Sequence, residues 1–221
     1  MTQRITLKLA TSLDGRIATA SGESRWITGP DARRQVHALR AEHQAVLVGV
    51  ETVIADDPAL TVRLGDFTGM QPHRVVLDSR LRTPLTSVLV ATAHDTPTLI
   101  LTTAPSDARE GSNERLTDAG VTVIEAREQD GRVDPTSAVS ALREQGMDHI
   151  LIEGGGRVAA SFLRAGLVDA VEWFRAPILL GAEGRPAVGG LGLDVLADAP
   201  RFRRTGLAEL GEDLWERYER G

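Results

Sequence analysis

Short apolar runs alternate with amphipathic segments along most of the chain, and the runs have the length of buried strands. Ile5, Leu7 and Leu9 alternate with less apolar neighbours, which predicts a strand at 5–10. This alternation points Lys8 away from the Leu7 and Leu9 face. Other apolar runs predict strands at 45–49, 75–77, 88–91, 99–101, 121–124, 150–152 and 168–180, and near 202–209 and 213–219.

Helical spacing of apolar residues predicts helices between these strands. Pro30 stands at the first position of a helix that runs to about His43, and Pro58 stops a short helix that begins at Val50. Further helical patterns cover about 106–119 and 135–145, and a helix after the glycines at 154–156 is closed by Gly166. The alternation predicts an α/β fold with a central, mostly parallel sheet, helices on both faces and an antiparallel C-terminal strand pair.

Composition limits the expected partners and setting. The 221 residues include 25 basic and 31 acidic ones, for a net charge of −6, which disfavours a nucleic-acid or anionic-membrane partner. The chain has no cysteine, so disulfides, thiolate zinc sites and cysteine nucleophiles are excluded, and a cytoplasmic setting fits. Neither a signal peptide nor a membrane span is expected. No linker or repeat divides the chain, so one domain over 1–221 is predicted.

Lys8 is the only lysine among the 25 basic residues, and all the others are arginines. A drift of composition towards arginine would also replace Lys8 unless a compact ammonium group is needed at that position. Chance survival is the alternative. The single lysine also excludes a Walker A loop, which requires the sequence Gly-Lys-Ser/Thr. The five histidines show no metal-binding spacing, and no metal is expected.

Glu153 and three following glycines stand at a predicted strand-to-helix junction. Bare backbone N–H groups at a helix N-terminus form an anion site, so this turn predicts a phosphate ligand, with a tight helix–sheet turn as the alternative. The spacing satisfies G-x-G-x-x-G/A, but the acid that should end the next strand of a Rossmann unit is absent. Glu153 either lies near a ligand at the carboxyl end of its strand or caps the helix.

Other polar segments offer further candidates, each with an ordinary structural alternative. Trp26 lies in a polar, glycine-bounded loop, where it either binds a flat partner or covers the core. Ser24 offers a hydroxyl to an anion or caps a helix. Arg40 and Arg63 are suited to bidentate phosphate binding, although most surface arginines are merely solvated.

Two acidic or polar turns complete the set. Asp56 and Asp57 precede Pro58, which favours a capped turn over a metal site. Ser79 and Arg80 follow the strand at 75–77 and would suit an adenosine 2′-phosphate, with a solvated turn as the alternative.

Taken together, five ordered motifs resemble one family, the pyrimidine reductase of riboflavin biosynthesis. They are Lys8-Leu-Ala-Thr-Ser-Leu-Asp-Gly15 and the segments 20–28, 49–63, 74–80 and 152–156. The similarity runs in register from about Ile5 to Leu180. It implies a dihydrofolate reductase-like fold, a homodimer, and reduction by NADPH of the ribosyl group of 5-amino-6-(5-phosphoribosylamino)uracil to ribityl.

The resemblance also implies roles for single residues. Lys8 matches a family lysine near the reacting sugar carbon, and Lys8 and Glu153 are the expected catalytic pair. The phosphosugar substrate would be bound by Ser24, Arg40, Leu60 (through its backbone), Arg63 and Glu153. NADPH would be bound by Trp26, Thr52, Asp56, Ser79, Arg80, Gly155 and Gly156.

Many relatives carry an additional N-terminal zinc deaminase. The chain contains neither H-x-E nor P-C-x-x-C, so no deaminase domain and no deamination are expected. Two alternatives stay open. One is a related reductase of another pyrimidine or a pterin in a specialised pathway, and the other is a non-catalytic module that binds NADPH or a phosphosugar.

Overall fold

The structure is a computed structural model that describes residues 3–103 and 111–221 of the chain. It contains two compact units. Apart from the N-terminal residues, the first unit comprises Arg40–Leu151, and the second comprises Arg4–Leu39 together with Ile152–Gly221. The expectation of one domain over 1–221 stays a prediction.

The first unit is built on strands in the order β9-β3-β4-β5-β6, of which β3 to β6 are parallel. Only the first part of β9 belongs to this unit. The strands are β3 (Ala45–Gly49), β4 (His73–Leu77), β5 (Thr98–Thr102), β6 (Thr122–Glu125) and β9 (His149–Gly154). The helices are α2 (Val50–Asp56), α3 (Val88–Ala91), α4 (Ser112–Asp118) and α5 (Pro135–Glu144), and β7 (Glu128–Gln129) pairs with β8 (Arg132–Val133).

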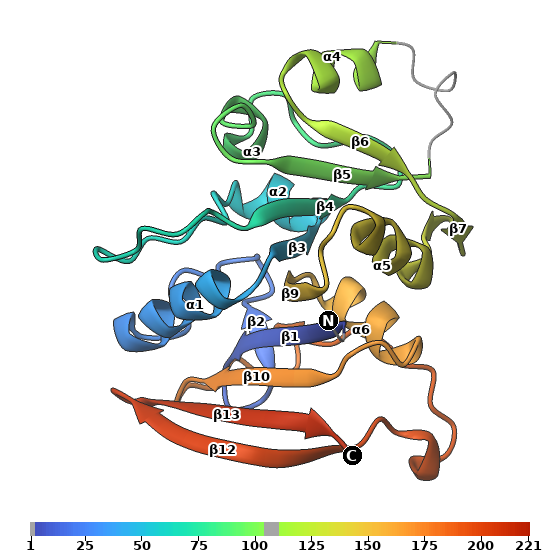
Figure 1. The fold of residues 1–221 in the computed structure, drawn as a ribbon. Coiled ribbons are helices and arrows are strands. Elements are labelled where there is room, and N and C mark those ends of the chain that lie inside the picture. The colour runs from blue at the N-terminus through green and yellow to red at the C-terminus, as the bar shows by residue number, and fades with distance from the viewer. Residues whose placement is uncertain (1–2, 104–110) are drawn as a thin grey trace. The chain divides into compact units, whose positions relative to one another are not determined.

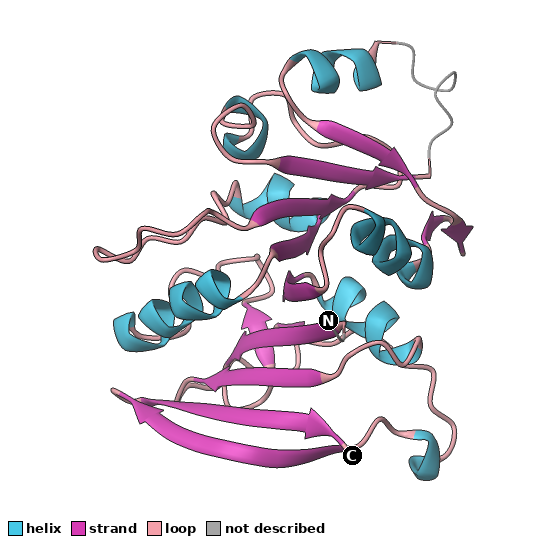
Figure 2. Ribbon diagram, in the orientation of Figure 1, coloured by secondary structure: helices cyan, strands magenta, loops and turns pink. Residues whose placement is uncertain are grey.

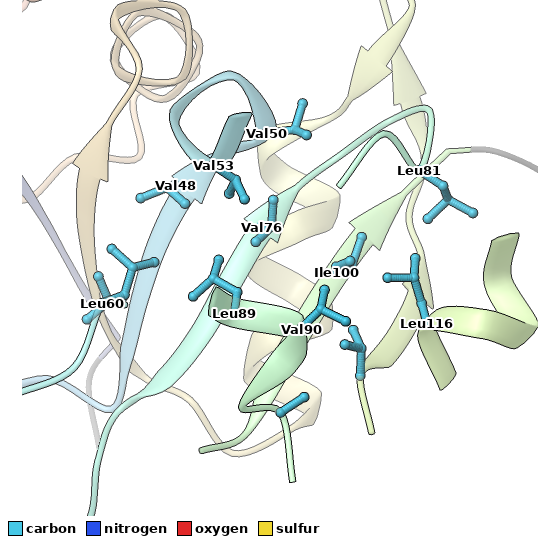
Figure 3. Packing of buried hydrophobic residues seen from close by; sticks show 13 residues of the cluster. Val48, Val50, Val53, Leu60, Val76, Leu81, Leu89, Val90, Ile100 and Leu116 are labelled. Atoms are coloured by element: carbon cyan, nitrogen blue, oxygen red, sulfur yellow. The ribbon is translucent and has the colours of Figure 1, made fainter. Parts of the chain in front are cut away.

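A continuous row of branched side chains forms the core of the first unit. Val48, Val76 and Ile100 occupy matching register positions on β3, β4 and β5 and are at most 1% exposed. Figure 3 shows this row together with Val53 of α2 and Leu89 of α3, which belong to the same cluster. Burying such a side chain contributes roughly 1.5–3 kcal/mol. The row therefore holds the three strands and both helices in one arrangement.

The second unit has the strand order β12-β13-β10-β1-β9. β1 (Arg4–Thr11) is parallel to β10 (Ala170–Arg175), and the hairpin of β12 (Phe202–Leu210) and β13 (Asp213–Arg220) adds to β10 in antiparallel register (Figure 1). The remaining elements are β2 (Arg16–Ala18), paired with β11 (Arg185–Pro186), α6 (Gly156–Arg164), η1 (Leu196–Asp198) and the part of α1 (Pro30–Glu42) up to Leu39.

Most predicted elements are confirmed, including the helix that begins at Pro30, the strand at 45–49 and the C-terminal antiparallel pair. The predicted helix at 106–119 begins outside the described residues, and α4 covers its later part. The α/β fold with a large, mostly parallel sheet is likewise confirmed. The sequence showed no signal for β2, β11 or the β7–β8 pair, because these strands are only two or three residues long.

The predicted strand at 88–91 is wrong, because these residues form the helical turn α3 (Figure 2). Tertiary hydrogen bonds explain the difference. The Asp57 carboxylate accepts the Val88 N–H at 2.8 Å, and the Arg74 guanidinium donates to the Leu89 carbonyl at 3.0 Å. A carboxylate at the first turn and a cation at the last turn both stabilise a helix. These contacts override the β preference of the valines.

The predicted strand at 168–180 is too long, since β10 ends at Arg175. After that point the backbone is bound to the turn that follows β1. The Leu13 N–H donates to the Ile178 carbonyl at 2.8 Å. The Asp14 carboxylate accepts the N–H groups of Leu180 and Gly181 at 3.1 and 2.8 Å. The backbone groups of this segment therefore bond to the turn rather than to a strand ladder.

Candidate functional site

Lys8 lies on the face of β1 opposite its apolar side chains, as predicted. Leu7 and Leu9 are 1% and 7% exposed, whereas Lys8 is half-buried. In the parallel register of β1 and β10, Lys8 is matched with Glu172. The sequence interpretation did not single out Glu172, because only the strand pairing brings this carboxylate to the level of the lysine.

The glycine turn joins the end of β9 directly to the start of α6. The N-cap position of α6 is taken by Gly155, which has φ +84°, so Glu153 does not occupy this position. A Cβ on Gly156 would lie 2.6 Å from the Pro186 carbonyl oxygen, and the Gly189 N–H donates to the Gly156 carbonyl at 2.7 Å. The close approach of this second backbone segment requires glycine at 156. The tight-turn interpretation is confirmed, and anion binding by Gly155 and Gly156 stays a prediction.

Trp26 does not cover the core, because its side chain is 68% exposed. Two guanidinium groups lie near its ring, that of Arg33 at 4.6 Å and that of Arg25 at 5.9 Å from the ring centroid. Ser24 is half-buried in the same loop, and α1 begins only after Gly29, so Ser24 is not its cap. An exposed indole near two cations is suited to stacking on a flat, negatively charged partner.

Arg40 is not a solvated surface arginine. Its side chain is 9% exposed, and Nη1 donates to the Thr61 carbonyl at 2.9 Å. Thr61 follows Leu60, which is buried and has φ +53°, and the exposed Arg63 comes two residues later. The structure thus brings Arg40, Leu60 and Arg63 together within the first unit. A buried guanidinium bound to this segment fixes the backbone that carries the other two residues.

The predicted cofactor residues of the first unit follow β3 and β4. Thr52 and Asp56 are four residues apart on α2 and therefore share one face of the helix. The Ser79 hydroxyl accepts the Val133 N–H at 2.9 Å, and Arg80 is exposed. Because the carboxyl ends of parallel strands meet at one edge of a sheet, these residues lie at the same edge of the unit.

Buried or bonded aspartates shape both of these turns. Asp78 is fully buried and accepts the N–H and hydroxyl of Thr83 at 2.7 and 2.8 Å, which closes the turn that carries Ser79. Asp57 accepts the Val88 N–H, in agreement with a capped turn. Within residues 3–103 and 111–221, no three acidic or histidine side chains gather in a way that could hold a metal ion. In the same ranges, no helix is long and apolar enough to span a membrane.

The hydrogen bonds of the Asp14 carboxylate lead us to expect a loss of stability in acid. A hydrogen bond from the Ser12 hydroxyl at 2.6 Å, with the N–H groups of Leu180 and Gly181, lowers the pKa of Asp14 from 3.8 to about 2. A lowered pKa in the folded state stabilises the protein above the unfolded pKa, and this contribution is lost as the pH falls through the folded value. Asp14→Asn is therefore expected to weaken the decline in stability between about pH 4 and pH 2.

Urea denaturation at several pH values in this window measures the effect. Asp198→Asn is the matched control, since it removes an exposed carboxylate from a short surface helix. The same pH slope for Asp14→Asn and the wild type would contradict the stabilising role of the ionised Asp14 side chain.

The chain matches the family model of the RibD C-terminal domain over residues 3–215. The chain belongs to this family. The resemblance found in the five motifs is thereby confirmed, and so is the dihydrofolate reductase-like fold.

Individual RibD relatives support the same assignment. The riboflavin biosynthesis protein RibD of Bacillus amyloliquefaciens is 40% identical over 211 residues, which cover 95% of this chain and 55% of that protein. A structure of Acinetobacter baumannii RibD has a TM-score of 0.83 at 32% identity, and the match covers 100% of this chain and 58% of that one. The chain thus spans somewhat more than half the length of these RibD proteins.

A shorter relative is matched almost completely. The 2,5-diamino-6-ribosylamino-4(3H)-pyrimidinone 5′-phosphate reductase of Methanothermobacter thermautotrophicus is 38% identical over 216 residues. The match covers 97% of this chain and 96% of that protein. One similar protein is therefore named as a reductase and has nearly the same length as this chain.

Proposed function

We propose that this chain is an NADPH-dependent reductase that converts the ribosyl group of 5-amino-6-(5-phosphoribosylamino)uracil to ribityl in riboflavin biosynthesis. The match to the Methanothermobacter reductase over 96% of its length carries the reductase part of this proposal. That relative is named for the non-deaminated pyrimidinone phosphate, and the choice of the deaminated substrate rests on the resemblance of the five motifs. That relative has nearly the same length as the matched region and is named as a reductase. The same proposal includes the state of the protein. We propose that it is a single-domain homodimer in the cytoplasm and that it has no nucleic-acid or membrane partner.

Substrate binding is assigned to Ser24, Arg40, Leu60, Arg63 and Glu153. The bond from Arg40 to the Thr61 carbonyl holds the segment on which Arg63 is exposed. A guanidinium on such a fixed segment can bind a phosphate ester through two parallel hydrogen bonds. Besides its assigned role in substrate binding, Arg40 thus orients the segment that carries Arg63.

NADPH binding is assigned to Trp26, Thr52, Asp56, Ser79, Arg80, Gly155 and Gly156. The donor groups on these segments fit the cofactor. The exposed Arg80 beside Ser79 suits a 2′-phosphate, and the α6 N-terminus with a glycine at its N-cap position suits a pyrophosphate. When bound, the cofactor supplies the hydride, and the protein aligns donor and acceptor.

Lys8 and Glu153 are the proposed catalytic residues. The ribosyl ring has to open before its first carbon can be reduced, and opening moves a proton. An ammonium group and a carboxylate that contact the sugar hydroxyls can orient them and carry out this acid–base step. Both side chains are half-buried, which leaves them accessible to a substrate.

A substrate panel tests the proposal through the near-ultraviolet absorbance of NADPH. The purified protein receives NADPH with the deaminated ribosylaminouracil phosphate, the non-deaminated diaminopyrimidinone phosphate or dihydrofolate. Oxidation with the first substrate alone is the expected result and places deamination before reduction. Oxidation with the diaminopyrimidinone phosphate alone would overturn the proposed substrate and place reduction before deamination, in line with the name of the Methanothermobacter relative. Oxidation with dihydrofolate alone would favour the pterin alternative. Binding of NADPH without oxidation by any of the three would overturn the proposed activity.

Arg80→Ala tests the preference for NADPH. We expect the ratio of kcat/KM for NADPH to that for NADH to fall about tenfold, because one charged contact to the 2′-phosphate is lost. Steady-state kinetics with both cofactors measure the ratio. Arg82→Ala is the matched control, since the Arg82 guanidinium already pairs with Glu51. An unchanged ratio in Arg80→Ala would show that Arg80 does not recognise the 2′-phosphate.

A further inference from the structure

We propose that Glu172 is a positioning residue for Lys8, whose ammonium group it keeps charged and in place. This inference rests on the proposed function, in which Lys8 acts on the sugar. It assigns a role to a carboxylate that lies outside the five motifs of the family resemblance. The argument concerns residues of the second unit only.

The strand register brings the two side chains to one level. Lys8 on β1 and Glu172 on β10 are matched positions of neighbouring parallel strands. Side chains at matched positions project from the same face of a sheet and interact as neighbours. Both residues are half-buried, so an interaction between their charges is less screened than it would be on an open surface.

The β13 hairpin strand orients the Glu172 carboxylate. Trp215 Nε1 donates to Glu172 Oε2 at 2.6 Å. The indole itself is held by stacking on Phe174, with ring centroids 5.8 Å apart and an interplanar angle of 2°. A hydrogen bond from a stacked, rigid donor restricts the rotamers of the carboxylate. Glu172 is thus a fixed partner for the flexible lysine side chain.

Arg217 continues the row on the other side of Glu172. It is matched with Glu172 in the β10–β13 register, and its guanidinium lies 4.8 Å from the centroid of the Trp215 ring. Gly206 stands opposite Arg217 on β12, where a Cβ would lie 2.5 Å from the guanidinium Nε. The missing side chain of Gly206 leaves space for Arg217. Charges of alternating sign therefore cross three strands at the level of Lys8.

Other ionisable groups also face this side of the sheet. Asp213 accepts the Gly29 N–H at 2.6 Å, which places the start of α1 on this face. The half-buried ionisable residues of α1 in this unit are Arg33, which lies over Trp26, and His37. Glu153 lies at the carboxyl end of β9, the strand on the other side of β1. Glu172 is the carboxylate that register matches with Lys8, and it favours the charged form of the amine.

The single lysine permits a direct test by nuclear magnetic resonance. Reductive methylation with ¹³C-formaldehyde labels only Lys8 and the amino terminus, and the pH titration of the Lys8 signal reports its pKa. Glu172→Gln is expected to lower the pKa of the Lys8 ammonium group. The acid dissociation constant of this group should rise about tenfold. Glu219→Gln is the matched control, because Glu219 lies on the same face but pairs with Arg4. An unchanged Lys8 pKa in Glu172→Gln would overturn the proposal.

Kinetics provide a second readout. Glu172→Gln should lower kcat about tenfold at neutral pH because the Lys8 ammonium group loses the carboxylate that orients it, with an unchanged KM for NADPH. Trp215→Phe keeps an aromatic ring at the position and removes the N–H donor, so a smaller decrease in the same direction is expected. A raised KM with unchanged kcat would contradict a role through Lys8. The titration tests the interaction between Glu172 and Lys8 even if the wild type reduces none of the substrates. A failure of the Glu172 proposal is therefore distinguishable from a failure of the proposed reductase activity.

Discussion

Replacing Lys8 by methionine is expected to lower kcat by about two to four orders of magnitude while leaving NADPH affinity within about twofold. Methionine keeps an unbranched apolar side chain, so the half-buried position on β1 stays filled. The ammonium group that would orient the sugar hydroxyls and move the proton is lost. Turnover is followed by NADPH absorbance, and cofactor affinity by quenching of tryptophan fluorescence.

Two further variants make the Lys8 result specific. Lys8→Arg keeps the charge but replaces a compact ammonium by a larger planar group, and it should recover little activity. Arg4→Met removes an exposed cation from the start of the same strand and should leave kcat unchanged. If Lys8→Met retained kcat within threefold, the proposed role of Lys8 would be wrong.

The largest expected effect on stability is that of Arg74→Met, which should lower the free energy of unfolding by about 3–5 kcal/mol because several buried acceptors lose a charged donor. The side chain is fully buried, and burial lowers its pKa from 12.5 to about 10, so it stays charged at neutral pH. The guanidinium donates to the Thr98 hydroxyl at 2.6 Å and to the Thr96 carbonyl at 2.8 Å. It also donates to the Thr92 hydroxyl at 2.8 Å. Methionine would remove this donor from all three buried oxygens, of which the Thr96 carbonyl keeps the longer bond from the Thr98 hydroxyl at 3.1 Å.

Urea denaturation of Arg74→Met measures this loss. Arg203→Met is the matched control, because the Arg203 side chain is 73% exposed, and it should change the free energy of unfolding by less than about 0.5 kcal/mol. Arg74→Lys keeps a charge but cannot reach all the acceptors, so an intermediate loss is expected. A loss below about 1 kcal/mol for Arg74→Met would contradict the structural role of these hydrogen bonds.

The elements that the sequence predicted correctly are those with strong local signals. Pro30 begins α1, and the apolar run at 45–49 forms the fully buried β3. The glycines after Glu153 end β9 and begin α6, because only glycine tolerates the positive φ of Gly155 without strain. Local signals also explain the error at 88–91, where a valine-rich run favours a strand until distant residues bond to it.

For the candidate site, the motifs identified the residues but not their surroundings. Arg40 and Arg63 were predicted as phosphate ligands, and only the structure shows that Arg40 is buried and bonded to the Thr61 carbonyl. Similarly, Trp26 had two possible environments until its exposure was known. The functional roles of all these residues stay predictions until the variants are measured.

The sequence by itself determined the fold class, the family and the identity of the motif residues, because short-range periodicity and ordered motifs are properties of the chain alone. Tertiary structure decided which distant groups meet. It matched Lys8 with Glu172, directed the Trp215 N–H to that carboxylate and surrounded Arg74 with neutral oxygens. Such contacts depend on strand register and burial, which arise only when segments far apart in the chain pack together.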